Sequence, residues 1–541
     1  MSYIKVENLN YSYPDEKNKS ICDINLEIDN GEILLLCGKS GSGKSTLGRC
    51  FTGAVPNFYG GTIGGNIIIN GKRLNELSER ERASYVTMVF QDPEKQILMD
   101  RVFREIAFGP ENVGVESKVI KRRVIETMQF CNILHLRDRL INTLSGGEKQ
   151  KVAVASALAY MPKIIVFDEP TSQLDPEASD EIVNLIKKIN SELGITVVLI
   201  EQRIDRCFDA ADKIAVMKDG RIVFYGDKVK MYSDNLNEVK SFLPSYLKAS
   251  KILGRKKMPQ SFKSLRKSLS KSEVSITNLD EQKINSVRED CAIEMRKVTC
   301  KYGDIAANNN IDLNIKSGSF NAIIGSNGAG KSTLVKAIMG FVNYNGNIKI
   351  LGHEVKKLKF KDIGIKIGYV SQNPNDYLSK DTVYDELKFT LNNYRINDDN
   401  LIDHTLKELD IYKLKSKNPR DLSGGEKQRA AIASVLVLKP EILILDEPTR
   451  GLDEEGKYKL GSILKTLNNN GSTIIMITHD LDFAARFCSN FILMFDGKVI
   501  SSGSKYDVLK DGIYYTTNIN KLFRDVEPNV FVIEDIKGDA L

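Results

Sequence analysis

The sequence predicts an α/β fold that occurs twice along the chain, and two repeated patterns predict it. A glycine-rich segment, GKSGSGKST at residues 38–46, returns as GSNGAGKST at residues 325–333. A short apolar run that ends in two acids, KIIVFDEP at residues 163–170, returns as EILILDEP at residues 441–448. Because these and further matched segments keep the same order, the two halves are predicted to be one fold with small insertions and deletions.

The composition is that of a globular protein. Of the 541 residues, 42% are hydrophobic and 27% are charged, which provides ample material for buried sheets. Length alone allows about three or four compact units, or two large ones that each carry a subdomain. No segment approaches the roughly 20 consecutive apolar residues that cross a bilayer, and the first residues lack the pattern of a secretory signal. We therefore expect the protein to stay in the cytosol unless another subunit holds it at a membrane.

Strands are expected around each repeated motif. Alternation of apolar and polar residues predicts a strand at the start of each half, at residues 3–13 and 293–302. Each glycine-rich segment follows an apolar strand, EILLLCG or FNAIIGS, and precedes a segment with helical periodicity. Each acid-terminated run is typical of a buried parallel strand whose carboxyl end faces a ligand crevice.

The glycine-rich segments have the pattern of a phosphate-binding loop. Their glycines let the backbone wrap tightly, so that consecutive N–H groups and the next helix N-terminus point at phosphate oxygens. Lys44 and Lys331 are expected to reach the β- and γ-phosphates, and Ser45 and Ser332 to offer their hydroxyls to Mg²⁺. The residues predicted to bind ATP in these loops are Gly38, Lys39, Ser40, Gly41, Ser42, Gly43, Lys44, Ser45 and Thr46, and Gly325, Ser326, Asn327, Gly328, Ala329, Gly330, Lys331, Ser332 and Thr333.

The acids that end the two apolar runs are predicted to serve catalysis. Asp168 and Asp446 would lie where Mg²⁺ is bound. Glu169 and Glu447, one residue further on, would polarise the water that attacks the γ-phosphate. An Asp-Glu pair is commonly a solvated turn, but the preceding apolar residues and the following Pro-Thr favour the catalytic interpretation.

Two more segments identify a family. LSGGEKQKVAVASAL at residues 144–158 and LSGGEKQRAAIASVL at residues 422–436 place Ser-Gly-Gly at the start of a helix, where N–H groups and the helix dipole favour an anion. With these segments the chain resembles two ATP-binding cassettes of the ABC transporter superfamily fused head to tail. The resemblance implies two P-loop NTPase domains of the ABC type in tandem, each a mixed β core with a helical subdomain, that hydrolyse ATP with Mg²⁺.

The resemblance also implies an intramolecular dimer of cassettes. In the family, the Ser-Gly-Gly segment of one cassette covers the ATP that the other cassette holds. ATP would then keep the two halves together, and hydrolysis would release them. Carried over to this sequence, the nucleotide on Lys331 would be covered by Ser145, Gly146 and Gly147, and the nucleotide on Lys44 by Ser423, Gly424 and Gly425.

Four more positions can be placed by the resemblance. Tyr13 and Tyr302 precede the phosphate loops where an aromatic ring stacks on adenine, although either residue also fits a half-buried strand tyrosine. Gln91 and Gln372 match the glutamine that senses Mg²⁺ and joins the core to the helical subdomain.

One position departs from the family pattern. After the later strand in each half, the family expects a histidine; TIIMITHD supplies His479, whereas TVVLIEQR supplies Gln202. Glutamine can hydrogen-bond a phosphate, but it cannot carry a proton or a positive charge into the transition state. We therefore expect unequal sites, with faster hydrolysis beside Glu447 than beside Glu169.

The segment that follows Gln91 indicates a branch of the family. DPEKQILMDRVFREIAFGPENVG, through PEKQI and through AFGPEN at residues 107–112, resembles the energy-coupling factor branch of importers. That branch implies a transmembrane coupling subunit, a small substrate-binding membrane protein, and uptake of a vitamin or a transition-metal ion. It further implies a peripheral position at the cytoplasmic face of the cell membrane, membrane contact only through partners, and no nucleic acid.

Three alternatives to this assignment stay open. The segment after Gln91 also fits a generic turn followed by an amphipathic helix. Cytosolic twin-cassette ATPases that act on ribosomes share the tandem organisation, but the chain lacks a long helical-hairpin pattern between its halves, where it has Gly254, Pro259 and many serines. Fused sugar-importer ATPases form the third alternative, and they resemble residues 91–114 less.

The motifs divide the chain into four parts. We expect a first cassette at residues 1–245, a basic linker at 246–290, a second cassette at 291–515 and a C-terminal extension at 516–541. Residues 248–272 carry nine Lys or Arg and no acid, which fits a solvated linker or a tether to anionic lipid headgroups. The extension contains a strand-like piece, NVFVIED, without an assigned role.

Overall fold

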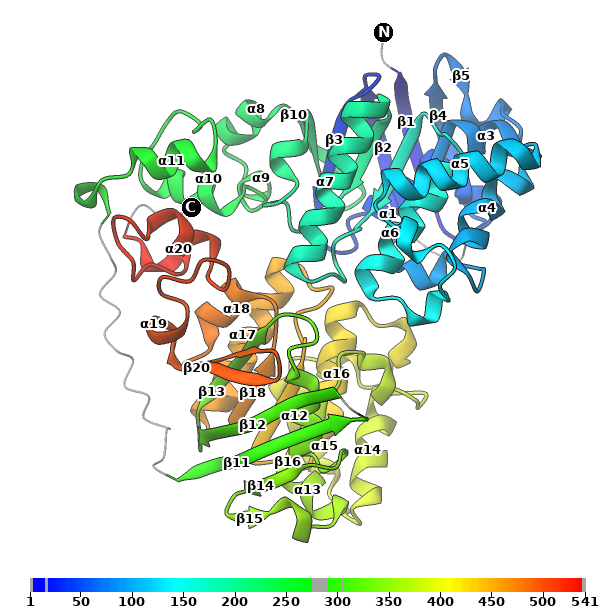
Figure 1. Cartoon of the computed structure of the whole chain (residues 1–541). Helices are drawn as coiled ribbons and strands as arrows, with labels where there is room; N and C mark the ends of the chain where they lie inside the picture. The colour runs from blue at the N-terminus through cyan, green and yellow to red at the C-terminus, as the bar shows by residue number, and fades with distance from the viewer. Residues whose placement is uncertain (1–2, 15–17, 275–289, 304, 538–541) are drawn as a thin grey trace. The chain divides into compact units, whose positions relative to one another are not determined.

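The computed structural model describes residues 3–14, 18–274, 290–303 and 305–537. The chain divides into two compact units and passes from the first to the second between residues 251 and 259. Figure 1 traces the elements of both units in chain order. Within the described ranges, no helix is both long enough and apolar enough to span a membrane.

The first unit begins with an antiparallel sheet whose strand order is β2-β1-β4-β5. The expected first strand is confirmed, because alternate residues of β1 are buried. The strands are β1 (Ile4–Ser12), β2 (Ile21–Ile28), β4 (Thr62–Ile69) and β5 (Lys72–Arg73).

A second, six-stranded sheet of this unit has the order β10-β9-β3-β8-β7-β6 and carries the motifs. Its strands pair in parallel except for β10, which runs antiparallel to β9. All residues of β3, β7 and β8 are buried. Because β8 pairs in parallel with both β3 and β7, the carboxyl ends of these strands lie at the same edge of the sheet. The strands are β3 (Ile33–Gly38), β6 (Val86–Val89), β7 (Ile164–Asp168), β8 (Thr196–Ile200), β9 (Lys213–Lys218) and β10 (Arg221–Gly226).

The helices of the first unit form a core set and a separate helical group. α1 (Lys44–Thr52) starts directly after the glycine-rich loop, and α7 (Pro176–Leu193) follows the acid-terminated strand. α4 (Val102–Asn112), α5 (Ser117–Phe130) and α6 (Gly146–Ala159) pack on one another and form the helical subdomain. The remaining helices are α2 (Ala54–Asn57), α3 (Glu79–Tyr85), α8 (Lys228–Ser233), α9 (Asn237–Lys240) and α10 (Ser245–Ile252).

The second unit repeats this architecture, which confirms the predicted tandem α/β fold. Its sheets have the orders β12-β11-β14-β15 and β16-β17-β18-β13-β19-β20. The strands are β11 (Cys291–Tyr302), β12 (Ile305–Lys316), β13 (Phe320–Gly325), β14 (Asn345–Ile350), β15 (His353–Glu354), β16 (Ile367–Val370), β17 (Ile442–Asp446), β18 (Thr473–Ile477), β19 (Asn490–Phe495) and β20 (Lys498–Ser504).

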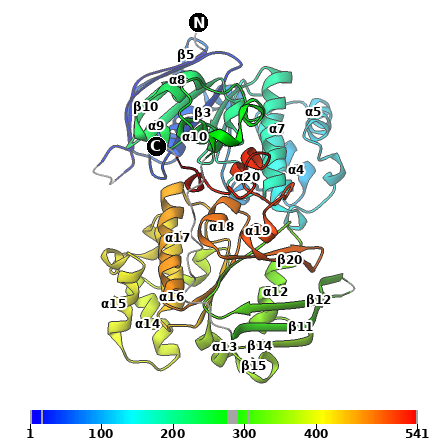
Figure 2. The ribbon, with the colours of Figure 1, turned by 90° about the vertical axis from the view of Figure 1, so that its left-hand side faces the viewer.

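The helices of the second unit follow the same plan. Figure 2 shows α14, α15 and α16 grouped on the side of this unit away from β11, β12 and β14. The helices are α12 (Lys331–Ile338), α13 (Phe360–Lys366), α14 (Val383–Asn393), α15 (Asp399–Glu408), α16 (Gly424–Leu436), α17 (Glu454–Asn469), α18 (Leu481–Phe487), α19 (Lys505–Val508) and α20 (Asn518–Phe523).

The basic segment between the halves is partly folded. Leu247 of α10 is buried in the first unit. In the second unit, a further helix, α11 (Phe262–Ser268), buries Leu265 and packs on α20. Arg266 forms an ion pair with Asp525 at 2.6 Å. The segment thus differs from a fully solvated linker, because Leu247, Leu265 and Leu269 are buried while lysines such as Lys256 are exposed.

The expectation of strand-like structure in NVFVIED is wrong. This stretch contains a short 3-10 helix, Ile533–Asp535, and no strand. The Asp535 carboxylate accepts hydrogen bonds from the N–H groups of Phe531 and Val532, at 2.8 and 3.0 Å, so a local side chain takes the donors that a strand partner would use. Phe531 and Val532 pack into a hydrophobic core of the second unit, so the C-terminal extension is part of that unit.

Candidate functional site

The phosphate loop of the first unit lies between β3 and α1. Gly38 and Gly43 have φ angles of 155° and 99°, and a Cβ atom at Gly38 would overlap the carbonyl oxygen of Met217. The tight course of the loop therefore requires glycine at this position. The Lys44 ammonium group donates to the carbonyl oxygens of Gly38 and Lys39, both at 2.8 Å, which places the cation inside the loop.

The loop of the second unit has the same construction between β13 and α12. Gly325 and Gly330 have φ angles of 149° and 93°, and a Cβ at Gly325 would overlap the carbonyl oxygen of Met494. Lys331 donates to the carbonyl oxygens of Gly325 and Ser326 at 2.9 and 2.8 Å. The other predicted loop residues lie between each strand and the first turn of the helix: Ser40, Gly41, Ser42, Ser45 and Thr46, and Asn327, Gly328, Ala329, Ser332 and Thr333.

The serine and the aspartate predicted to bind Mg²⁺ come together in both units. The Ser45 hydroxyl donates to Oδ1 of Asp168 at 2.8 Å, and the Ser332 hydroxyl donates to Oδ2 of Asp446 at 3.2 Å. Burial raises the pKa of both aspartates, and the serine hydrogen bond opposes that shift. In each unit a serine hydroxyl and a buried carboxylate beside the phosphate loop provide the hard oxygen ligands that Mg²⁺ prefers, so these residues fit the ion.

Glu169 directly follows β7 in the first unit. Its φ of 46° is in the left-handed region, which is strained for a residue with a side chain. Both carboxylate oxygens are engaged: Gln202 donates to Oε1 at 2.5 Å, and Gln91 donates to Oε2 at 2.9 Å. The first unit therefore brings together the predicted base and the two glutamines that sequence reasoning assigned to this site.

Glu447 occupies the corresponding place in the second unit, with a φ of 50°. Burial raises its pKa to about 7, and the nearby Asp446 carboxylate raises it further, against a hydrogen bond from the backbone of His479. Nε2 of His479 lies 3.4 Å from Oε1 of Glu447. Gln372 is exposed, and within the described ranges its side chain makes no hydrogen bond, so this predicted residue stays apart from the glutamate.

The two predicted adenine-stacking tyrosines have different surroundings. The Tyr13 hydroxyl accepts a hydrogen bond from Arg49 at 2.8 Å and lies 3.3 Å from the Thr46 hydroxyl. Its ring packs edge-on against Tyr11. The Tyr302 residue of the second unit is 50% exposed. Tyr13 is thus held in place by its neighbours, whereas Tyr302 presents an open ring.

The Ser-Gly-Gly segments begin helices, as expected. Ser145 caps α6 and Ser423 caps α16, and each forms a reciprocal capping box with the glutamate three residues later. Both serines and the glycines that follow them are exposed or half-buried.

Sequence reasoning missed residues that brace the segment after Gln91. The side-chain oxygen of Gln96 accepts the N–H of Phe90 at 2.9 Å, and the Tyr377 hydroxyl accepts the N–H of Ser371 at 3.0 Å in the second unit. Gln96 and Tyr377 therefore each accept a backbone N–H at corresponding positions, one through an amide oxygen and the other through a hydroxyl. No shared residue type marked the pair, so sequence comparison of the halves could not find it.

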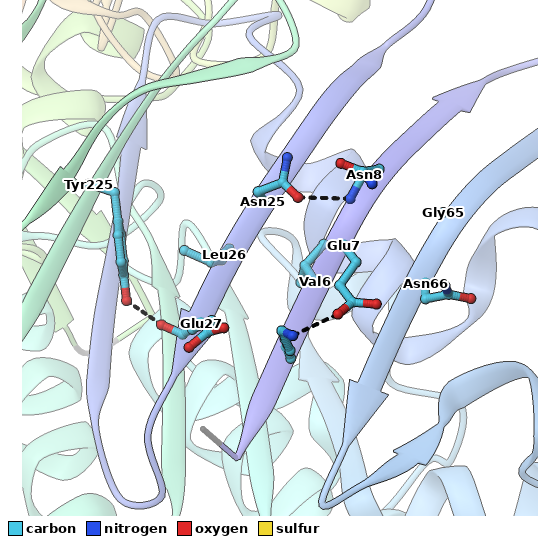
Figure 3. A pocket seen from close by; sticks show the side chains of 10 residues that line it. Val6, Glu7, Asn8, Asn25, Leu26, Glu27, Gly65, Asn66 and Tyr225 are labelled. Atoms are coloured by element: carbon cyan, nitrogen blue, oxygen red, sulfur yellow. Dashed lines mark hydrogen bonds and ion pairs between the residues drawn. The ribbon is translucent and has the colours of Figure 1, made fainter. Parts of the chain in front are cut away.

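A hollow of about 710 Å³ lies elsewhere on the first unit (Figure 3). It is lined from β1, β2 and β4, together with Tyr225 of β10, whose hydroxyl donates to the Glu27 carbonyl. None of the residues predicted for nucleotide binding lines this hollow. It is therefore separate from the phosphate loop and the acids that follow β7.

Several known proteins are similar to this chain. Among solved structures, cbiO1 of Clostridium perfringens, part of the ABC transporter complex cbiONQ, is 32% identical; the match covers 47% of this chain and 96% of that chain, with a TM-score of 0.40. An ABC transporter ATP-binding protein of Bacillus anthracis is 34% identical over 546 residues, which covers 99% of this chain and 98% of the relative. One from Clostridium tetani is 41% identical over 424 residues, covering 78% of this chain and 96% of the relative. The model of the ABC transporter family matches residues 21–172 and 308–450. From the family match and the full-length relatives, the chain belongs to the ABC transporter family and contains two of its ATP-binding domains.

Proposed function

We propose that this protein is the ATP-hydrolysing, energy-coupling subunit of an importer of the energy-coupling factor type. Its two units, called here the first and second cassette, would close head to tail on two ATP molecules and reopen after hydrolysis. The observation that carries the proposal is that each cassette builds the same set of groups: a loop lysine, a serine bonded to a buried aspartate, and a strained glutamate one residue later.

The loop groups of each cassette suit Mg-ATP. The lysine ammonium lies among loop carbonyls and would bind β- and γ-phosphate oxygens. Ser45 with Asp168, and Ser332 with Asp446, would hold Mg²⁺, which when bound neutralises charge on the phosphates. The exposed Ser-Gly-Gly helix starts would bind the phosphates held by the opposite cassette.

Catalysis is proposed to be faster in the second cassette. A general base works best when its pKa lies near the working pH, and burial gives Glu447 a pKa of about 7. His479, at 3.4 Å, can take up or release a proton beside it. In the first cassette, two glutamine amides hold the Glu169 carboxylate, and neither amide can exchange a proton. Gln202 therefore cannot serve as the proton carrier that His479 can be.

The partners are proposed to be a transmembrane coupling subunit and a small substrate-binding membrane protein, which bring the chain to the cytoplasmic face of the membrane. Support comes from PEKQI and AFGPEN and from exposed apolar side chains near Gln91. Phe90 and Leu98 are exposed, whereas the second cassette has Ser371 and Ser379 at the corresponding positions. Unequal surfaces suit a partner that presents two non-identical helices. A vitamin or a transition-metal ion is the proposed solute.

The ribosome-associated alternative finds less support. Such proteins would use a long helical hairpin between their cassettes. The described part of the basic join has two short helices, α10 of 8 residues and α11 of 7 residues, with Gly254 between them. The helices are anchored by buried apolar side chains to separate compact units.

Two experiments test the proposal. The doubly substituted Glu169→Gln, Glu447→Gln protein should become more compact on addition of Mg-ATP, as measured by small-angle scattering, and should stay open with ADP. An unchanged radius with ATP bound would count against head-to-tail closure. Affinity purification from detergent-solubilised membranes should recover two small membrane proteins. Recovery with ribosomes instead would support the alternative.

A further inference from the structure

The first cassette buries a carboxyl group that the proposed reaction does not use. Glu201 directly follows β8, and only 2% of its surface is exposed. Burial raises the pKa of Glu201 to about 7, and the charge of Glu169 adds to the shift. A carboxyl group this deeply buried requires hydrogen-bond partners.

Thr171 supplies those hydrogen bonds. Its hydroxyl donates to Oε1 of Glu201 at 2.7 Å, and its backbone N–H donates to the same oxygen at 3.2 Å. Thr171 lies in the turn that begins at Glu169, where the Ser172 N–H and hydroxyl donate to the Glu169 carbonyl at 3.2 and 2.9 Å. Glu201 therefore holds the turn in which Glu169 has its left-handed conformation.

That conformation needs support from its surroundings. A residue with a side chain keeps a positive φ only where neighbouring groups hold it there, and such strain is common at catalytic positions. The backbone N–H of Glu169 donates to the carbonyl of Ile200, the residue before Glu201, at 2.9 Å. The carboxyl of Glu201 and the end of β8 thus fix the turn from two sides.

The second cassette has a different residue at this position. Thr478 stands at the position of Glu201, and its hydroxyl accepts the N–H of Asp480 at 3.0 Å. A buried ion pair, Lys457 to Asp480 at 2.8 Å, ties the residue after His479 to α17. The first cassette has no counterpart of this ion pair at the matching positions, where it has a serine and an arginine. The Thr171–Glu201 contact is therefore particular to the first cassette.

We propose that Glu201 is a positioning residue of the first site: by holding Thr171, it fixes the turn that orients the Glu169 carboxylate toward the attacking water. The inference rests on the proposed function, because it requires Glu169 to act in ATP hydrolysis. Glu201 works through Thr171 and has no role in holding the phosphates.

The test uses the full chain with Glu447→Gln, so that only the first site turns over. Single-turnover hydrolysis and ATP affinity are measured separately. Glu201→Gln keeps an oxygen for Thr171 and should stay within about twofold of the parent, whereas Glu201→Thr should lower the rate constant about tenfold with ATP affinity unchanged. Thr171→Val should give the same loss, and the double variant Glu201→Thr, Thr171→Val should lose no more than either alone.

Thr196→Val is the matched control. Thr196 is buried at the opposite end of β8, and its hydroxyl accepts the N–H of Gly31 at 2.9 Å. Its substitution removes a buried hydrogen bond from the same strand and should lower the melting temperature without changing the first-site rate constant.

Three results would overturn the inference. Equal loss in Glu201→Gln and Glu201→Thr would mean that the charge, and not the contact with Thr171, matters. Parallel loss of ATP affinity and rate, matched by Thr196→Val, would mean general damage to the cassette. If the Glu447→Gln protein shows no hydrolysis that Glu169→Gln abolishes, the first site does not turn over, and Glu201 has no catalytic carboxylate to orient. Hydrolysis by the second site would still support the proposed function.

Discussion

Gln202 donates a hydrogen bond to Glu169 at 2.5 Å, in the place where His479 of the second cassette lies 3.4 Å from Glu447. The other oxygen of Glu169 accepts from Gln91 at 2.9 Å, so two amides hold this carboxylate. An amide cannot exchange a proton near neutral pH, whereas an imidazole can. The two cassettes thus share a fold but surround Glu169 and Glu447 with chemically different side chains.

Exchanging Gln202 and His479 should exchange the relative hydrolysis rates of the two sites. In a Glu447→Gln background, Gln202→His should raise first-site single-turnover hydrolysis about tenfold, because the histidine can carry a proton. In a Glu169→Gln background, His479→Gln should lower second-site hydrolysis by at least about tenfold. Rates are measured by quenched-flow release of phosphate. Unchanged rates in both backgrounds would show that this position does not set the difference.

The serine–aspartate pairs predict a magnesium effect. Ser45→Ala and Ser332→Ala should each raise the Mg²⁺ concentration needed for half-maximal hydrolysis at their own site by about tenfold, since an oxygen ligand is lost. The measurement is a magnesium titration of ATPase activity, with chelator abolishing activity in all proteins. Ser191→Ala, which changes an exposed serine of α7, serves as control. An unchanged magnesium requirement in Ser45→Ala and Ser332→Ala would remove these serines from the metal site.

The buried Glu201 predicts a pH-dependent stability. Burial raises its pKa from 4.5 to about 7, so the folded chain keeps a proton that the unfolded chain releases. Stability from this group is therefore present at low pH and is lost as pH rises toward 7. Glu201→Gln removes this dependence, and its unfolding free energy relative to the parent should improve by about 2 to 3 kcal/mol between pH 5 and pH 8.

Calorimetric unfolding of the full chain at several pH values measures this difference. Thr196→Val should differ from the parent by an amount that is the same at every pH. A pH-independent difference for Glu201→Gln as well would contradict the raised pKa.

The C-terminal extension should contribute to the stability of the second cassette. Phe531 is fully buried in its core, so Phe531→Ala should destabilise that cassette by about 3 to 5 kcal/mol. Phe495→Ala makes the same chemical change at a residue that is 56% exposed and should cost far less. Calorimetry compares the two variants. Equal, small shifts would mean that the extension is dispensable for folding.

The sequence was sufficient where structure is set locally. Buried strands and phosphate loops follow from apolar runs and from glycine positions that no other residue can occupy, so β3, β7 and the loop before Lys44 were predicted within a few residues. NVFVIED failed because its apolar pattern fits a strand, whereas the Asp535 side chain takes the N–H groups at close range. Hydrophobic periodicity does not report such a local competitor.

The sequence predicted which residues belong to the candidate site better than it predicted the contacts between them. Gln91, Gln202 and Glu169 were all named from their motifs, but their mutual hydrogen bonds join residues far apart in sequence. The Thr171–Glu201 pair spans 30 residues and uses types that occur everywhere in proteins. Only a fold that places the end of β8 beside the turn after β7 makes this pair visible.

The inequality of the two sites is tested most directly by single-turnover ATP hydrolysis of Glu169→Gln and Glu447→Gln, each in the full chain with its membrane partners. We expect Glu447→Gln to lose most of the fast hydrolysis, by at least about tenfold, and Glu169→Gln to retain it. Equal losses in the two proteins would contradict an unequal pair of sites.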